Sequence, residues 1–121
     1  RSLERSVHFY RDILGFRPAT DGELEPGARA MAFSGGRTHH ELLLIEIGDD
    51  LPPASRGRRV GLYHFGLKVG DTDDELRAVL KRITEEGVRI VGASDHNITH
   101  SLYILDPDGN ELELYADVSD E

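Results

Sequence analysis

The chain has 121 residues, about the size of one domain, and its spread of apolar residues is typical of a globular fold. Its 14 Lys and Arg against 23 Asp and Glu give a net charge of −9, which disfavours nucleic acid and membrane surfaces as partners. The absence of cysteine excludes disulfides and thiolate metal sites, so a metal would be held by His and carboxylate groups, and the cytoplasm is the expected compartment.

The first predicted element is a helix at the start of the chain. Ser2 can cap it, and Gly15 supplies the left-handed residue that ends it. Apolar residues recur along one of its sides: Leu3, Val7, Tyr10 and Leu14. Because the chain opens on Arg1 rather than Met, directly at this cap, we expect that residues precede it.

The second half of the chain contains a strand and a well-marked helix. Residues 62–69 alternate apolar side chains with other types, which predicts a strand. Residues 72–87 follow as a helix, in which Thr72 and Glu75 form a capping box and Gly87 ends the last turn. The apolar residues of this helix recur at helical spacing: Leu76, Val79, Leu80 and Ile83.

A predicted hairpin follows this helix. Residues 102–105 and 111–115 are its strands, and the sequence Asp-Pro-Asp-Gly-Asn at residues 106–110 is typical of a tight turn.

The two halves of the chain repeat each other with an offset of 72 residues. Gly15 and Gly87 stand 72 residues apart, and each is followed by an apolar residue. The same offset maps the hairpin onto residues 30–33 and 39–46, which predicts two strands joined by a Gly-Gly turn. The counterpart of strand 62–69 falls before Arg1.

These elements predict an α+β fold. Two tandem modules, each of a strand, a helix and three strands, form one domain (residues 1–121) with a half-open mixed β-sheet cleft. Module one (1–58) lacks its first strand, and module two spans 59–121. The missing strand leaves a sheet edge unpaired, so we expect an upstream segment or a partner to cover that edge.

His64 and Glu113 are the strongest candidates for a functional site. Each alternates with apolar neighbours on its predicted strand, so the two side chains can share one face of a sheet. The structural alternative is a satisfied histidine and a solvent-facing carboxylate. The pair by itself does not define a site.

Four stretches of the chain resemble the vicinal oxygen chelate superfamily of glyoxalases, bleomycin resistance proteins and extradiol dioxygenases, and are closest in appearance to catechol 2,3-dioxygenase-like proteins. They are residues 3–16 (LERSVHFY through LGF), 61–65 (GLYHF), 92–96 (GASDH) and 106–115 (DPDGN through ELY).

This resemblance implies a divalent metal held by a His on the first strand, by His64 and by Glu113. The first ligand would lie roughly eight residues before Arg1, by the 72-residue offset. Fe(II) or Mn(II) is expected for a dioxygenase, and Zn or Ni for a glyoxalase-like enzyme. Glu41 lies 72 residues before Glu113 and is a candidate fourth ligand, with Glu46 as its alternative and an exposed strand acid as the structural reading.

His96 and Tyr103 resemble the His that lies beside the metal ligands and the catalytic Tyr of ring-cleaving dioxygenases. An imidazole and a phenol near a catechol could move protons during ring cleavage. The spacing between His96 and Tyr103 is short for such enzymes, which leaves His100 as a substitute for His96. The structural alternatives are a loop histidine and a half-buried aromatic residue.

The remaining histidines carry weaker predictions. His8 is expected on the first helix near Arg5 and Asp12, as a surface residue. His39 and His40 are expected on opposite faces of one strand, where at most one could line a substrate cavity.

The leading functional hypothesis is a metal-dependent extradiol-type dioxygenase acting on a catecholic small molecule. The alternatives are a glyoxalase-like isomerase or epimerase, in which Glu41 would act as a base, and a binding protein for an antibiotic or other small molecule that has no catalytic activity. A homodimer is expected from the resemblance. Whether the chain is part of a longer protein is left open by the sequence.

Overall fold

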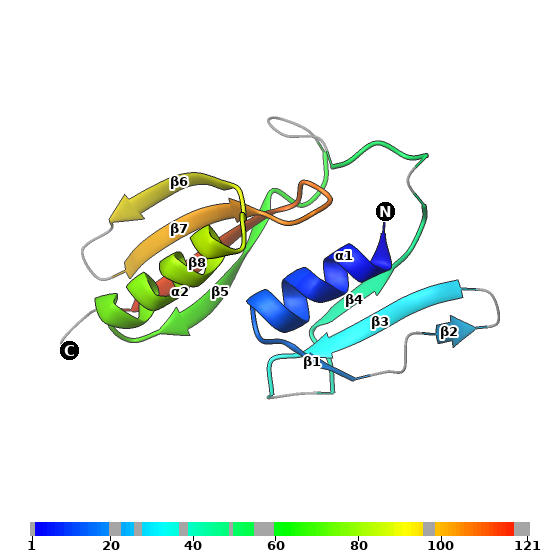
Figure 1. The fold of residues 1–121 in the computed structure, drawn as a ribbon, viewed down its shortest axis with the longest axis horizontal. Helices are drawn as coiled ribbons and strands as arrows, with labels where there is room; N and C mark the ends of the chain where they lie inside the picture. The colour runs from blue at the N-terminus through cyan, green and yellow to red at the C-terminus, as the bar shows by residue number, and fades with distance from the viewer. Residues whose placement is uncertain are drawn as a thin grey trace. The chain divides into compact units, whose positions relative to one another are not determined.

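The computed structural model describes residues 2–19, 23–25, 28–36, 39–48, 50–54, 60–95 and 99–117. The chain forms two compact units, Arg1–Pro53 and Ala54–Glu121. Each unit contains a four-stranded sheet with helix packed against it (Figure 1). The α+β fold built from two similar modules is therefore confirmed.

The first unit begins with the predicted helix. Helix α1 (Leu3–Val7) continues into a π-helical segment, η1 (His8–Ile13), which the sequence pattern did not predict. The Ser2 side chain accepts a hydrogen bond from the backbone N–H of Arg5, and Gly15 ends the segment with a φ of 85°. The side chains buried on this helix form much of the core of the unit: Leu3, Val7, Phe9, Tyr10 and Ile13.

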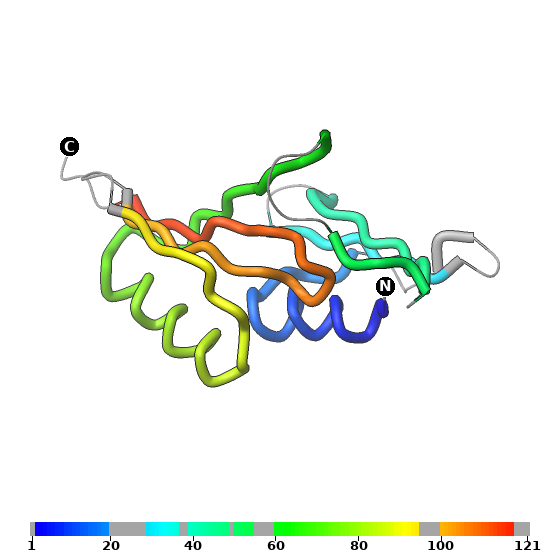
Figure 2. The backbone as a smooth tube through the Cα atoms, turned by 90° about the horizontal axis from the view of Figure 1, so that it is seen from above, coloured from blue at the N-terminus to red at the C-terminus, as the bar shows by residue number. Residues whose placement is uncertain are grey.

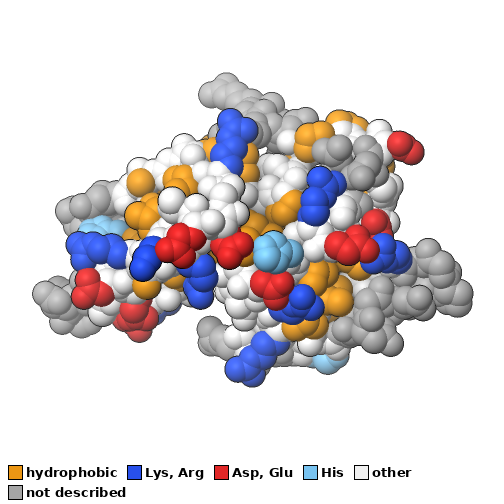
Figure 3. Space-filling view, in the orientation of Figure 1, with side chains coloured by type: hydrophobic (Ala, Val, Ile, Leu, Met, Phe, Trp, Pro, Cys, Tyr) orange, Lys and Arg blue, Asp and Glu red, His pale blue; other side chains and the backbone are white. Residues whose placement is uncertain are grey.

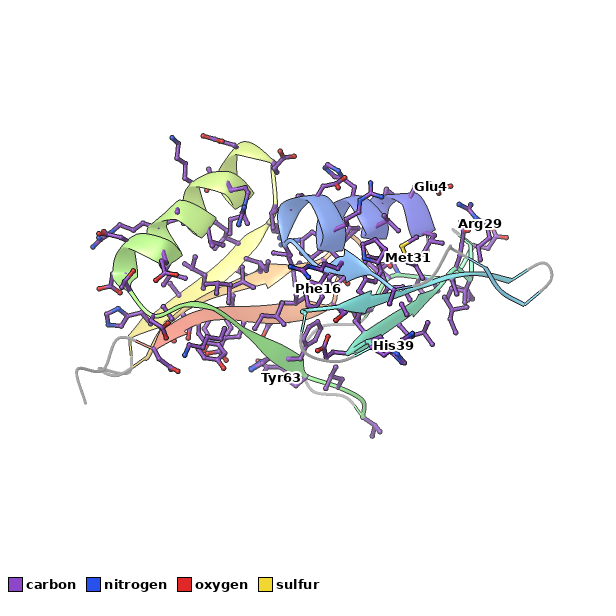
Figure 4. The ribbon with its side chains drawn as sticks, turned by 90° about the horizontal axis from the view of Figure 1, so that it is seen from below. Glu4, Phe16, Arg29, Met31, His39 and Tyr63 are labelled. Atoms are coloured by element: carbon purple, nitrogen blue, oxygen red, sulfur yellow. The ribbon has the colours of Figure 1, made fainter. Side chains whose placement is uncertain are left out.

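Strand β3 (Ala28–Ser34) is the centre of the first sheet. It pairs in antiparallel fashion with β1 (Arg17–Pro18), β2 (Glu23–Glu25) and β4 (Leu42–Ile45). Arg29 of β3 reaches Glu4 of α1, and the two side chains point toward one another in Figure 4. Their Nη2 and Oε1 atoms lie 2.5 Å apart, and Arg29 lowers the pKa of the Glu4 carboxyl.

The second strand of the first hairpin is shorter than predicted, because it begins only at Leu42. His39 and His40 therefore precede the strand, and the prediction that they lie on its opposite faces is wrong. Their rings contact each other edge to face, with centroids 5.1 Å apart. The connection that replaces the start of the strand includes Gly36, whose φ of 103° favours glycine.

The described residues of the second unit form four strands and one helix. They are β5 (His64–Gly70), α2 (Asp73–Glu85), β6 (Ile90–Asp95), β7 (Thr99–Leu105) and β8 (Glu111–Asp117). The strand order is β5-β8-β7-β6, in which β5 runs parallel to β8 and the other pairs are antiparallel. Helix α2 covers one face of this sheet (Figure 2). Its predicted cap is confirmed, since the Thr72 hydroxyl accepts from the N–H of Glu75 at 3.1 Å.

Alternation along β8 separates the two faces of the second sheet. Leu112 and Leu114 are fully buried on the side of α2, together with Ile104 of β7 and Ile83 of the helix. The residues between them point to the other face, and the candidate site lies there.

The two sheets differ at one edge in the part of the chain that the structure describes. Within the described residues, no strand of the first unit pairs with the outer edge of β4, whereas β5 occupies the corresponding edge of β8. Leu43 and Ile45 correspond by register to Leu112 and Leu114, yet they are 43% and 50% exposed while the latter are 0% exposed. Among the described residues of the first unit, these two apolar side chains therefore lie uncovered.

In the part of the chain that the structure describes, no helix is long and apolar enough to cross a membrane.

Candidate metal site

The face of the second sheet opposite α2 carries the candidate site. Strand pairing places Tyr103 directly beside Glu113 and Gly66 on its other side, with His64 beside Glu111. We call this surface the polar face, and its members are His64, Gly66, Ser94, Ser101, Tyr103, Glu111, Glu113 and Tyr115. The sheet therefore brings His64, Glu113 and Tyr103 together on one side.

His64 lies between two carboxylates. Its Nδ1 is 3.2 Å from Oε2 of Glu111, and its Nε2 is 3.3 Å from Oε1 of Glu113. The three side chains are partly buried, at 27%, 16% and 21% exposure for His64, Glu111 and Glu113. Nδ1 itself is buried and lacks an aligned hydrogen-bond partner. A buried polar atom in this position calls for a partner, and Oε2 of Glu111 is the carboxylate oxygen beside it.

Ser101 fixes the second carboxylate. Its hydroxyl donates to Oε2 of Glu113 at 2.6 Å, which leaves Oε1 facing the imidazole of His64. Ser101 is 2% exposed, so this hydrogen bond lies in a site shielded from water. The Glu113 carboxylate is thereby held in one orientation.

Tyr103 lies next to His64. The two ring centroids are 5.8 Å apart in an edge-on arrangement, and the Tyr103 hydroxyl is 3.3 Å from the Ser94 hydroxyl. The phenol is thus half-buried and already has a hydrogen-bonding partner on the polar face.

The two histidines considered as proton-transfer groups have different outcomes. His96 lies outside the described residues. His100 is described, but its ring hydrogen-bonds Asp73 at the start of α2, and its side chain lies on the face opposite Tyr103. It does not join the polar face.

Glu41 is not the counterpart of Glu113. Tyr103 pairs with Glu113, and its equivalent Met31 pairs with Leu44, so Leu44 holds the corresponding place. The 72-residue offset fails here because the connection before β4 is longer than the turn before β8. Glu41 instead accepts from the N–H of Gly35 at 2.7 Å.

Glu46, the alternative fourth ligand, and His8, the predicted surface histidine, both lie in the first unit. Glu46 pairs with Arg29, with Oε2 and Nη1 3.0 Å apart. His8 contacts Asp12 at 3.1 Å, as its helical spacing predicted. Arg11 and His8 hydrogen-bond the carboxyl of Asp12 and lower its pKa to about 2. Arg11 is exposed beside it, so this cluster lies at the surface.

The donor set at His64 and Glu113 fits a divalent metal. Two ligands bound at about 2.1 Å and separated by roughly a right angle lie about 3 Å apart, close to the 3.3 Å between Nε2 and Oε1. The described residues contain no group of three or more His, Asp or Glu side chains arranged to hold a metal. These two groups therefore account for part of a coordination sphere.

Two of the residues around His64 were missed from the sequence. Glu111 stands two positions before Glu113, so strand alternation could have identified it. Ser101 could not be identified in this way, because its contact depends on the register of β7 against β8. Acidic and basic side chains are interspersed over the viewed surface (Figure 3), and the excess of acid gives no signal that singles out these residues.

Comparisons with known proteins agree with the fold. Residues 1–114 match the family described as the glyoxalase/bleomycin resistance protein/dioxygenase superfamily. The chain is 38% identical to catechol-2,3-dioxygenase of Bacillus subtilis over 97% of its own length but only 38% of that protein's. It is 28% identical to a probable lactoylglutathione lyase of Synechocystis, covering 93% of this chain and 85% of the lyase.

Solved structures show the same architecture. Lactoylglutathione lyase from Agrobacterium tumefaciens aligns with a TM-score of 0.66 at 26% identity, covering 95% of this chain and 85% of that one. The fosfomycin resistance protein FosX from Listeria monocytogenes aligns with a TM-score of 0.73 at 18% identity, covering 98% and 86%. The chain belongs to the glyoxalase/bleomycin resistance protein/dioxygenase superfamily. Members of this superfamily bind divalent metals, and a FosX variant has been crystallised with Mn(II).

Proposed function

We propose that this chain forms part of a metal-dependent, extradiol-type dioxygenase that cleaves the ring of a catecholic or related small molecule with adjacent oxygen atoms. The similarity to catechol-2,3-dioxygenase at 38% identity supports the substrate class. The placement of His64 between two carboxylates supports the metal, and it is the observation on which the proposal depends.

His64 has too few ring protons to satisfy both of the carboxylates that face it. A neutral imidazole has one N–H, whereas His64 faces a carboxylate oxygen from each ring nitrogen. One nitrogen then directs its lone pair at an anion, which is repulsive unless the ring is protonated or a cation lies between them. A divalent metal bound by Nε2 and Glu113 removes this repulsion and uses both groups as ligands.

Fe(II) or Mn(II) would supply the chelation of both substrate oxygens and the activation of O2. This chain's own residues would hold and orient the site. Ser101 keeps the Glu113 carboxylate in place, and the Tyr103 hydroxyl is available to move a proton at a substrate oxygen. We keep His96 as a second proton-transfer group on the strength of the sequence resemblance alone.

Metal binding tests the first half of the proposal. Mn(II) titration followed by electron paramagnetic resonance measures free and bound ion in the wild type, in His64→Ala and in Glu113→Gln. We expect binding in the wild type and a loss of at least tenfold in affinity in each variant. Asp117→Ala, a carboxylate change on the same strand, serves as the control and should bind like the wild type. Equal binding by all four proteins would contradict the assignment of these ligands.

Activity tests the second half. The chain is loaded with Fe(II) under anaerobic conditions, and catechol and air are then added. A yellow ring-fission product is expected, and its absence from a protein that has bound iron would reject the dioxygenase.

A glyoxalase-like isomerase is the second candidate, because the chain spans 85% of the length of the lactoylglutathione lyase but only 38% of the dioxygenase. This reading favours Zn or Ni as the metal. Formation of lactoylglutathione by the Zn- or Ni-loaded chain, without ring cleavage by the Fe-loaded chain, would select it. Ligand binding without turnover in either assay would instead select a small-molecule binding protein.

A further inference from the structure

Glu111 is a partly buried carboxylate to which the proposed reaction assigns no task. It stands two residues before Glu113 on the polar face and is 16% exposed. Burying a carboxylate costs free energy unless it is paired or hydrogen-bonded. Its ion-pair partner in the structure is Nδ1 of His64, at 3.2 Å.

His64 has a ring nitrogen that requires a hydrogen-bond partner. Nδ1 is buried and without an aligned hydrogen-bond partner, so it is the ring nitrogen that water does not reach. Oε2 of Glu111 already lies within hydrogen-bonding distance, and a small rotation of either side chain would align the two groups. Among the described residues, Glu111 is the carboxylate that faces Nδ1.

The two carboxylates around His64 are not equivalent. Glu113 already accepts a short hydrogen bond from the Ser101 hydroxyl, which draws part of its negative charge away from the ring. Within the described residues, no hydroxyl donates to Glu111. Glu111 is therefore the stronger acceptor for the single proton of a neutral His64 ring.

We infer that Glu111 is a positioning residue that holds the proton of His64 on Nδ1 and so leaves the Nε2 lone pair directed toward Glu113. Histidines that bind metals commonly donate their other ring N–H to a carboxylate, which fixes the tautomer and the orientation of the ring. The role toward a metal rests on the proposed function. The control of the tautomer rests only on the contacts of Glu111, His64 and Ser101.

The tautomer is measured directly in the metal-free protein. Nitrogen-15 and proton correlation spectra of the imidazole rings distinguish a proton on Nδ1 from one on Nε2, and they are recorded at an alkaline pH where the His64 signals no longer change. We expect the Nδ1–H form in the wild type and a shift toward the Nε2–H form in Glu111→Ala. Glu111→Gln keeps an acceptor oxygen and should retain the Nδ1–H form.

Two controls separate this effect from loss of charge or of fold. Asp117→Ala removes a negative charge from the same strand, six residues or about 20 Å away, and should leave the tautomer unchanged. Circular dichroism checks that each variant is folded. If Glu111→Ala is unfolded, the wild type and Glu111→Gln still show which ring nitrogen carries the proton. An Nε2–H form in the wild type, or an unchanged Nδ1–H form in a folded Glu111→Ala, would overturn the inference.

The consequence for metal is measured separately, by Mn(II) titration of the same variants. Loss of a group that orients a ligand typically lowers metal affinity about 10- to 100-fold, so Glu111→Ala should bind within that range more weakly and Glu111→Gln should recover most of the loss. Failure of the wild type to bind Mn(II) would reject a metal site formed by His64 and Glu113 in this chain alone, while the spectra would still decide the role of Glu111.

Discussion

Among single residues, Tyr103 is the strand residue whose surroundings best suit the proton transfer proposed for it. Its ring packs edge-on against His64, and its hydroxyl is oriented toward Ser94. The phenol is therefore held beside the proposed metal ligands without being one of them. A side chain in this position can transfer a proton without altering how the site binds its metal.

Tyr103→Phe tests this separation of roles. The variant removes only the hydroxyl, so Mn(II) affinity should remain within about twofold of the wild type. The ring-cleavage rate should fall about 100-fold or more, because general acid-base groups typically contribute at least that factor. Equal rates for the two proteins at saturating catechol would assign Tyr103 a packing role.

Asp12 provides a pH-dependent test that does not involve the site. Arg11 and then His8 lower the pKa of Asp12 to about 2, below its value of about 3.9 in an unfolded chain. The ionised form is thus favoured by folding, and its stabilising effect is present above pH 4 and is lost as the pH falls toward 2. Because the groups are exposed, the effect is small and decreases with added salt.

The comparison is between the melting temperatures of the wild type and Asp12→Asn from pH 7 to pH 2. The wild type should melt higher above pH 4, and the difference should shrink as the pH falls below that value. A difference that grows on acidification would contradict the assignment.

At the scale of elements, helix α2 is the best-specified part of the chain. Thr72 accepts from the N–H of Glu75 at 3.1 Å, and Oε1 of Glu75 lies 3.3 Å from the N–H of Asp71. These local bonds satisfy backbone donors at the start of the helix, and Gly87 follows its end with a φ of 73°. The boundaries of the helix therefore depend on neighbouring residues only.

Thr72→Ala should destabilise the second unit by about 1 kcal/mol, the usual effect of losing an N-cap side chain. Thr84→Ala makes the same substitution at an exposed position inside the helix and should cost nothing, since Ala is the better helix former. Urea unfolding followed by circular dichroism gives both values. Equal effects of the two substitutions would show that the cap does not contribute.

The two hairpins differ in how well the local sequence pattern predicts the pairing register of their strands. Strands β7 and β8 are joined by the turn at residues 106–110, in which the Asp106 carboxylate accepts from the N–H groups of Asp108 and Asn110. The connection between β3 and β4 is longer, and Glu41 bonds back to Gly35. This difference shifts the register of β4 and places Leu44 where the sequence offset predicted Glu41.

In the molecule as a whole, the outer edge of β4 carries exposed apolar side chains and has no paired strand among the described residues. Leu43 and Ile45 are exposed along it, and Ile47 beyond the strand is 59% exposed. An apolar sheet edge with free backbone groups favours pairing with another strand. We expect this edge to contribute to self-association of the chain, in line with the proposed homodimer.

Ile45→Lys places a charge on this edge and should reduce self-association, because a lysine opposes the approach of a second strand. Leu62→Lys is the matched control, since Leu62 is 68% exposed and precedes β5. Sedimentation velocity over a range of concentrations measures the association of both. Identical behaviour of the two variants would show that the edge is not the contact.

The fold class, both helices in outline, the hairpins and the candidate pair His64 and Glu113 could be predicted from the amino-acid sequence. Helix caps, helical spacing and strand alternation depend on residues a few positions apart, so they can be read without knowing the fold. The resemblance to the superfamily predicted a divalent metal and the class of reaction. None of these predictions requires knowledge of a tertiary contact.

The side chains that surround His64 could not be predicted without the three-dimensional structure. Strand pairing sets Ser101 against the Glu113 carboxylate and sends His100 to the opposite face, toward Asp73. The pairing of β3 with β4 also shows that Leu44, and not the predicted Glu41, is the counterpart of Glu113. The physical reason is register: the side chains that meet across a sheet depend on turn length and on the packing of both faces, and residues distant in sequence contribute to both.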